Sequence, residues 1–419
     1  MQGCSKKLQS FLIYRMRCSE TVAGNNNCCD VGHKPLFINK GGTKVKKKVL
    51  ALILSTAMAA SLVTGCGSGA EGTSAPAADT AAETETPADS GAETTQDTAA
   101  ADSGASGTKT FAIVTKSAGN PYNEKEASGF QEAVEGEGYV CVVQHPETAT
   151  PDAQISVIQS LISQGVDAIC IAGNDENALQ SALTDAMNQG IKVSCLDSKV
   201  NKDSRATFVN QAGTDEIGLA LMDAVYDLSG GEGDWAILSA TSQAANQNAW
   251  IESMKSLMES DSKYAKLNLV EVAYGDDEPQ KSTDQTQALL QNYPDLKVIC
   301  APTTVGIAAA AKVLQDQGSS VKLTGLGLPS EMAEYIGDDD AHSCPYMFLW
   351  NPIDVGRLGA YTSIALVNGD ITGASGEKFT AGDMGEYTIV DASDGGTEII
   401  LGPPFKFDPS NIDEWKDVY

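Results

Sequence analysis

The chain has 419 residues, and its 56 acidic against 28 basic side chains give a formal net charge of −28 at pH 7. A surface this acidic repels phosphate backbones, which makes nucleic acid a poor partner. After residue 108 the chain carries two histidines and five single cysteines, without CxxC or HxxxH spacing, so no metal site, thiol catalyst or cofactor is expected. Cys170, Cys195 and Cys300 lie in apolar runs and are expected to be buried free thiols.

A basic patch followed by an apolar run marks the N-terminal part of the chain. Four lysines between residues 44 and 48 precede Val49–Val63, and the run ends in Val63-Thr64-Gly65-Cys66. Residues 45–65 are therefore predicted to be a secretory signal, since the apolar run is short for a membrane span. The cysteine after Gly65 resembles a bacterial lipobox, in which Cys66 becomes the lipidated first residue. A plain signal peptide with a coincidental cysteine is the alternative.

The segments on either side of this signal have different expected roles. Residues 1–44 hold four cysteines and no readable periodicity, and we expect them to be an untranslated upstream extension, with translation beginning at Val45. Residues 66–108 are rich in Ala, Thr, Ser, Gly, Glu and Asp and lack aromatic side chains, so they are predicted to be a flexible acidic linker. Lipid on Cys66 would hold the protein at the cell surface, on the outer face of the cytoplasmic membrane.

The rest of the chain alternates short apolar runs with amphipathic stretches that end at glycine. In its first part, apolar runs predict strands at Thr110–Thr115, Tyr139–Gln144, Ala168–Ala172 and Lys192–Leu196. Amphipathic stretches between them predict helices at Glu124–Gly136, Ile155–Gln164 and Glu176–Asn188. The second part begins with a helix and repeats the alternation. Its helices are predicted at Gly213–Leu228, Asn248–Glu259, Thr283–Asn292 and Val305–Gln317, and its strands at Trp235–Ser239, Leu269–Tyr274, Val298–Ala301 and Lys322–Gly327. A further helix is predicted at Asp354–Asn368.

This alternation predicts an α/β fold with two Rossmann-like lobes, each built on a parallel sheet, and a cleft between them. About 310 residues is also more than one hydrophobic core normally takes. Ligands of such sheets bind outside the carboxyl ends of the strands. That rule selects the residues that follow predicted strands: Lys116, Asn174, Asp175, Asp197, Ala240–Gln247, Pro302–Thr304 and Leu328.

Eight short segments together carry a family pattern: Val114–Tyr122, Cys195–Ser198, Leu238–Thr241, Asn246–Trp250, Ala301–Pro302, Gly325–Met332, Leu349–Pro352 and Leu401–Phe405. In combination they resemble the type I periplasmic binding proteins, and within them the rhamnose-binding and autoinducer-binding branch. The resemblance implies two lobes joined by a multi-strand hinge, a small sugar as ligand, an ABC permease in the membrane as partner, and a monomer.

The resemblance also implies domain boundaries. It assigns residues 109–210 plus 351–372 to the N-terminal lobe and residues 211–350 plus 373–419 to the C-terminal lobe. The hinge is expected near Asn210–Gln211, Leu328–Pro329 and Trp350–Asn351.

Polar residues at strand ends are the candidates for binding sugar hydroxyls, because hydrogen bonds to charged groups are strong. Asp197 and Lys116 occupy such positions, where a solvated loop aspartate and a surface lysine are the alternatives. Asn246 and Gln247 precede a predicted helix, which Asn246 could instead cap. In the autoinducer-binding branch the matching pair is Asp-Gln, whereas the rhamnose-binding branch has Asn-Gln, as here.

The remaining candidates are less directly marked. Pro302 and Thr304 match positions where the family offers backbone contacts, and a simple strand-to-helix turn is the alternative. Tyr122 and Trp350 are expected to stack on a sugar ring, or else to fill the core. Asn351 is expected in the hinge or at the ligand. The predicted function is therefore capture of rhamnose or a similar deoxyhexose, with a furanose-type autoinducer as the alternative ligand.

Other functions are weakly supported by the sequence. An enzyme would need a nucleophile–base pair or a metal, and none of the usual motifs is present. Gly325-x-Gly327-x-x-Ser330 imitates a dinucleotide fingerprint, but its third glycine is a serine and no acidic ribose partner follows on a second strand. A ligand-sensing regulator would need a DNA-binding domain ahead of Lys109, which the sequence does not indicate, and it would not carry a secretory signal.

Overall fold

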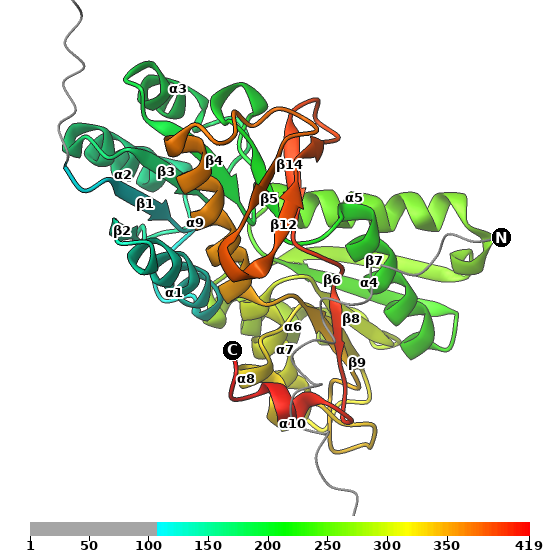
Figure 1. Cartoon of the computed structure of the whole chain (residues 1–419). Helices are drawn as coiled ribbons and strands as arrows, with labels where there is room; N and C mark the ends of the chain where they lie inside the picture. Colours follow the sequence, from blue (N-terminus) through cyan, green and yellow to red (C-terminus); the bar gives the residue numbers. More distant parts are fainter. Residues whose placement is uncertain (1–106) are drawn as a thin grey trace, which may run out of the picture. The chain divides into compact units, whose positions relative to one another are not determined.

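The computed structural model describes residues 107–419, which belong to one compact unit. The predicted leader, the lipidation site at Cys66 and nearly all of the predicted 66–108 linker lie outside the described residues. Two sheets, one parallel and one parallel except for a short edge strand, form the two lobes of this unit, and helices cover each of them (Figure 1).

The first lobe is built on a seven-stranded sheet of order β13-β14-β5-β4-β3-β1-β2. Its strands are β1 Thr110–Val114, β2 Val140–Gln144, β3 Ala168–Ile171, β4 Lys192–Leu196, β5 Phe208–Asn210, β13 Val390–Asp391 and β14 Thr397–Ile400. All neighbours are parallel except β13, which pairs antiparallel with β14. Its helices are α1 Pro121–Gly136, α2 Pro151–Gln164, α3 Gln180–Asn188 and α9 Pro352–Asn368.

Alternating side chains of β1 supply both faces of this sheet. Phe111 and Ile113 enter the core that α1 and α9 cover, whereas Ala112 and Val114 enter the core beneath α2 and α3. Because a strand places successive side chains on opposite faces, a continuous apolar run means that both faces are buried.

The second lobe is built on a four-stranded parallel sheet of order β7-β6-β8-β9. Its strands and helices are α4 Thr214–Ser229, β6 Gly233–Ser239, α5 Ala245–Ser260, β7 Leu267–Tyr274, α6 Pro279–Asn292, β8 Val298–Ala301, α7 Thr304–Asp316, β9 Lys322–Gly325 and α8 Pro329–Met332. Helices α4 and α5 pack together, as do α6 and α7, and all four residues of β8 are buried.

Two small antiparallel pairs complete the fold: β10 Met347–Leu349 with β15 Phe405–Phe407, and β11 Lys378–Thr380 with β12 Glu386–Thr388. A last short helix, α10 Ile412–Trp415, contacts α8.

The chain crosses between the lobes at three places, and one of them differs from the prediction. The crossings are residues 211–213 between β5 and α4, Trp350–Asn351 between β10 and α9, and residues 401–404 between β14 and β15. Leu328–Pro329 is not a crossing, because it joins β9 to α8 within the second lobe. The assignment of all of 373–419 to the second lobe is also wrong, since β14 pairs with β5 of the first sheet.

Helix starts were predicted too late wherever a proline opens the helix. Pro121, Pro151, Pro279 and Pro352 each stand in the first turn, where the missing N–H costs nothing. Helix α3 is shorter than predicted and begins at Gln180, because residues before it form a turn in which Asp175 accepts from the backbone of Asn177.

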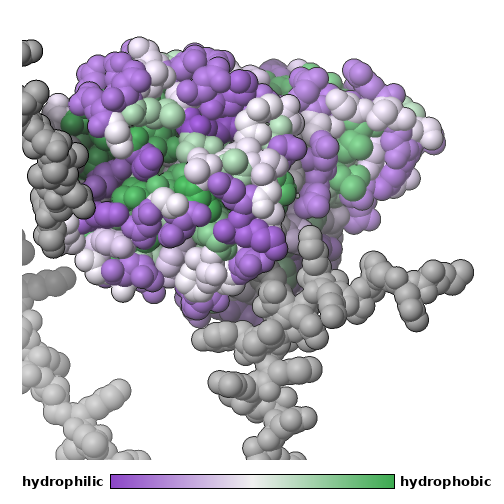
Figure 2. All heavy atoms as spheres, turned by 45° about the horizontal axis from the view of Figure 1, so that its top comes forward, coloured by the Kyte–Doolittle hydropathy of each residue, from purple (hydrophilic) through white to green (hydrophobic). Residues whose placement is uncertain are grey.

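Within residues 107–419 no helix is long and apolar enough to span a bilayer. The same residues contain no cluster of three or more His, Cys, Asp and Glu placed to hold a metal ion. Cys170, Cys195 and Cys300 are buried free thiols, as predicted. Figure 2 shows hydrophilic residues over most of the face in view, with smaller areas of hydrophobic residues between them.

Candidate functional site

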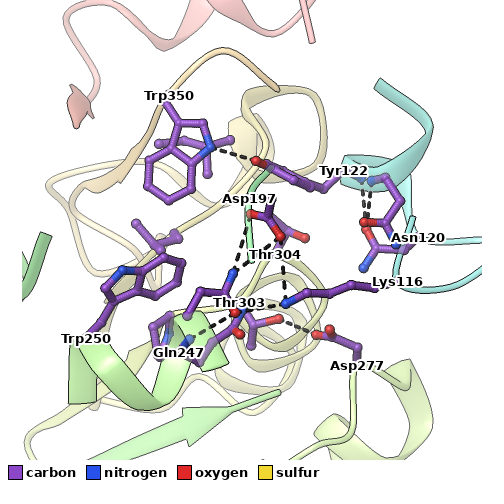
Figure 3. Close-up of a pocket in the computed structure, with 15 residues that line it drawn as sticks. Lys116, Asn120, Tyr122, Asp197, Gln247, Trp250, Asp277, Thr303, Thr304 and Trp350 are labelled. Atoms are coloured by element: carbon purple, nitrogen blue, oxygen red, sulfur yellow. Dashed lines mark hydrogen bonds and ion pairs between the residues drawn. The ribbon is translucent and has the colours of Figure 1, made fainter. Parts of the chain in front are cut away.

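The carboxyl ends of both sheets face one cleft between the lobes. Lys116 follows β1 and Asp197 follows β4 in the first lobe, while Pro302 follows β8 and Asn246 opens α5 in the second lobe. Together with neighbouring side chains they line a cavity of about 40 Å³ (Figure 3). The strand-end rule therefore brings together residues up to 186 positions apart, from Lys116 to Pro302.

A buried polar network of Lys116, Asn246 and Asp197 joins the two lobes across the cleft. Lys116 donates from Nζ to Oδ1 of Asn246 over 2.8 Å, and the same ammonium lies 3.7 Å from the Asp197 carboxylate. Asn246 in turn donates from Nδ2 to the two Asp197 oxygens over 3.4 and 3.3 Å. Since Lys116 and Asp197 are only 6% and 5% exposed, the lobes are closed around these groups.

Burial dominates the electrostatics of the carboxyl groups in the cleft. It raises the pKa of Asp197, and Lys116 beside it opposes that shift. It also raises the pKa of Asp277, against the Thr303 hydroxyl that donates to Asp277. Burying a carboxylate without hydrogen-bond partners costs free energy. Asp197 and Asp277 therefore favour a ligand that can donate hydrogen bonds to them.

Glu126 is a further buried carboxyl, on the same helix as Tyr122. Both of its oxygens are buried without a hydrogen-bond partner among the described residues. Burial, reinforced by the charge of Asp197 and opposed by Lys116, raises the pKa of Glu126 well above its usual range. Burial without partners therefore disfavours a negative charge on Glu126.

An aromatic wall faces this polar network. Trp350 donates from Nε1 to the Tyr122 hydroxyl over 2.7 Å, and the rings of Trp250 and Trp350 meet edge to face with centroids 5.8 Å apart. Leu326 and Leu349 line the same cavity. The cleft thus offers flat apolar surface on one side and hydrogen-bonding groups on the other, as Figure 3 shows.

Local backbone geometry places the cleft residues. Asp197, directly after β4, has φ at 57°, a left-handed conformation that aspartate adopts more readily than most residues. Asn120 caps α1 by accepting from the backbone of Tyr122, and Pro121 starts that helix, which fixes Tyr122 in its first turn. Asn174 donates to the carbonyl of Lys116 over 2.9 Å, which holds the loop after β1.

Eight of the nine predicted ligand residues line this cavity: Lys116, Tyr122, Asp197, Asn246, Gln247, Pro302, Thr304 and Trp350. Asn246 does not cap α5, whose cap position is Ala244. Asn351 does not line the cavity. Its side chain accepts from the backbone of Ile353 at the start of α9 and donates to Asp354, so it caps the helix beside the crossing.

Thr303, within the selected range Pro302–Thr304, also lines the cavity. Six further lining residues were not predicted: Asn120, Asn123, Trp250, Asp277, Leu326 and Leu349. Two of them carried a usable signal. Asp277 follows the predicted strand Leu269–Tyr274, so the strand-end rule would have selected it. Trp250 lies four residues after Asn246, which puts both on one face of α5.

Comparison with known proteins identifies the family. A model described as a periplasmic binding protein domain matches residues 111–371. A crystal structure of an ABC transporter solute binding protein from Clostridium phytofermentas with bound L-rhamnose is 64% identical, with a TM-score of 0.74, and the match covers 75% of this chain and 99% of that one. A sugar ABC transporter protein from Actinomyces odontolyticus is 39% identical, with a TM-score of 0.59, over 73% of this chain and 97% of that one.

A more distant structure shares the fold. LsrB from Clostridium saccharobutylicum in complex with AI-2 is 21% identical, with a TM-score of 0.68, over 73% of this chain and 99% of that one. The family match covers more than half of the chain, and relatives at 39% and 64% identity agree with it. The chain therefore belongs to the periplasmic binding proteins, among the solute-binding proteins of ABC transporters.

Proposed function

We propose that this protein binds L-rhamnose or a closely similar deoxyhexose in the interlobe cleft and delivers it to an ABC permease. The observation that carries the proposal is the composition of the cleft, in which buried Asp197, Lys116 and Asn246 face an aromatic wall. The L-rhamnose in the relative at 64% identity supports the choice of sugar.

The chemistry of a deoxyhexose matches the two sides of the cleft. Its hydroxyls need directional donors and acceptors, which the carboxylate of Asp197, the ammonium of Lys116 and the amide of Asn246 provide. Its methyl group and C–H face need apolar surface, which Trp350 and Leu349 provide. The sugar would replace the direct Lys116–Asn246–Asp197 contacts with hydrogen bonds of its own.

Binding without catalysis is part of the proposal. The described residues that line the cleft include no histidine and no cysteine. Two lobes linked by three crossings can instead open and close around a ligand, and the closed form is then recognised by the membrane component. The protein would act as a monomer in this cycle.

Calorimetric titration tests the ligand. We expect L-rhamnose to bind with one-to-one stoichiometry, and the furanose-type autoinducer AI-2 to compete weakly, because Asn246 cannot supply the acidic side chain found there in the autoinducer-binding pattern. Saturable binding of AI-2 with no heat from L-rhamnose would reverse the assignment. Turnover of labelled L-rhamnose by the purified protein would contradict a purely binding role.

We also propose that lipid on Cys66 anchors the mature protein to the outer face of the cytoplasmic membrane, with residues 66–108 as a tether. The basic patch, the apolar run and the cysteine after Gly65 support this. Cys66→Ser removes the thiol that carries the lipid, so we expect the variant to shift from the membrane to the soluble fraction or to stay unprocessed. Unchanged membrane association, measured by fractionation and immunoblotting, would contradict the anchor.

A further inference from the structure

A second cavity lies beside the first crossing between the lobes. We call it the hinge chamber, and it is bordered by Asn210 and Gln211 at the end of β5, by Glu398 of β14, and by Ala245 and Ala249 of α5. Its cavity volume is about 80 Å³, compared with about 40 Å³ in the central cleft. Since a single buried water needs about 10–15 Å³ by this kind of measure, the chamber has room for a group much larger than water.

The hinge chamber and the central cleft share a wall. Asp197, Asn246 and Trp250 line both cavities. The polar part of this wall is the Asn246–Asp197 contact, whose distances of 3.3 and 3.4 Å lie at the long end of hydrogen bonding. A ligand that spans both cavities would have to displace the Asn246 side chain from this contact.

Gln211, at the border of the chamber, has an unpaired side-chain amide. The residue is 1% exposed, and neither its amide nitrogen nor its amide oxygen has a hydrogen-bond partner among the described residues. Leaving a buried donor and acceptor unpaired is costly, and native structures tolerate it only for a reason. A hydroxylated ligand in the chamber would satisfy both atoms if the Gln211 side chain turned toward it, because a hydroxyl both donates and accepts.

The charges around the chamber are already paired within the protein. Asp394 accepts from Arg205 over 2.7 Å and lies 3.9 Å from the ammonium of Lys199, while Glu398 accepts from Asn210 over 2.9 Å. With Asp197 at the shared wall, the surroundings offer no surplus positive charge. A neutral hydroxylated group therefore suits the chamber, and an anionic group does not.

We propose that the hinge chamber is a second sugar subsite, which takes a neutral hydroxylated unit linked to the monosaccharide in the central cleft. The protein then binds neutral disaccharides and glycosides of its cleft sugar as well as the monosaccharide. This inference rests on the proposed function, since it requires the first unit to occupy the cleft.

The test compares L-rhamnose with neutral disaccharides that carry L-rhamnose, namely rhamnosyl-rhamnose and rhamnosyl-glucose, by calorimetry on the whole mature chain. We expect at least one disaccharide to bind within about tenfold of L-rhamnose or more tightly. Ala249→Phe projects a ring into the hinge chamber from α5. It should weaken the disaccharide at least tenfold while L-rhamnose binding changes less than about twofold.

Gln211→Leu gives an independent reading, because it removes the unpaired amide but keeps the size of the side chain. We expect it to weaken the disaccharide by about threefold to tenfold, the range for losing one or two neutral hydrogen bonds. Ala265→Phe, at an exposed position of the second lobe, is the matched control for Ala249→Phe and should alter neither affinity.

The outcomes separate the two proposals. If L-rhamnose binds and no disaccharide does, the second subsite is wrong and the proposed function stands. If Ala249→Phe leaves disaccharide binding unchanged, or weakens both sugars equally, the chamber is not a separate subsite. If neither kind of sugar binds to the unmodified protein, the proposed function itself fails.

Discussion

Replacing Asp197 by alanine is expected to weaken L-rhamnose binding by roughly tenfold to a hundredfold. The substitution removes a charged acceptor from a closed site, and a hydrogen bond to a charged group contributes about 1.5–3 kcal/mol. It also leaves the Lys116 ammonium, which is 6% exposed, without the carboxylate 3.7 Å away. Titration calorimetry gives the affinity directly.

The backbone at this position calls for a second variant. Asp197 has φ at 57°, and alanine tolerates that conformation less well than aspartate or asparagine. Asp197→Asn therefore keeps the backbone preference and the shape while it removes the charge, and it should weaken binding about tenfold. Asp295→Asn, at an exposed position before β8, is the control and should bind as the unmodified protein does. If Asp197→Asn and Asp197→Ala both bind as tightly as the control, the ligand does not contact Asp197.

The largest expected effect on stability comes from Gly356→Ala. Helices α1 and α9 approach so closely that a Cβ on Gly356 would lie 1.9 Å from the carbonyl oxygen of Glu126, and a Cβ on Gly129 would lie 2.0 Å from that of Ile353. Backbone atoms cannot rotate away, so the helices must separate. We expect a loss of about 3 kcal/mol in the free energy of unfolding, at the upper end for overpacking.

Thermal and urea unfolding measure this loss, and the same helix pair offers a control. Gly136, the last residue of α1, has no atom within 4 Å of the position its Cβ would take. Gly136→Ala should therefore be neutral or slightly stabilising, because alanine has the higher helix propensity. Equal unfolding midpoints for Gly356→Ala and Gly136→Ala would show that α1 and α9 are not packed as described.

Much of the fold was predictable because long apolar runs and amphipathic stretches carry strong periodic signals. Strand Val298–Ala301 was predicted at its observed bounds, and the predicted run Lys192–Leu196 is β4. The strands after α9 were not predicted. β13 and β14 have two and four residues, too few for a period to show, and β14 pairs with β5 about 190 positions earlier in the chain.

The cleft was predictable to the extent that one rule governs it. Lys116, Asp197 and Pro302 stand at the carboxyl ends of parallel strands, and the topology alone brings such positions together. Leu326 and Leu349 carried no such mark, because an apolar residue near a strand end looks like core in the sequence. The hinge chamber could not be predicted from the sequence either, because it depends on the pairing of β14 with β5.

The central claim is that the cleft between the lobes closes on a sugar, and small-angle scattering of the mature protein tests it most directly. The structure has the cleft residues buried, so the profile with saturating L-rhamnose should agree with the closed arrangement of residues 107–419. Without sugar the lobes are expected to open about the three crossings, which gives a larger radius of gyration. Identical profiles with and without L-rhamnose, at a concentration that calorimetry shows to be saturating, would contradict closure on the ligand.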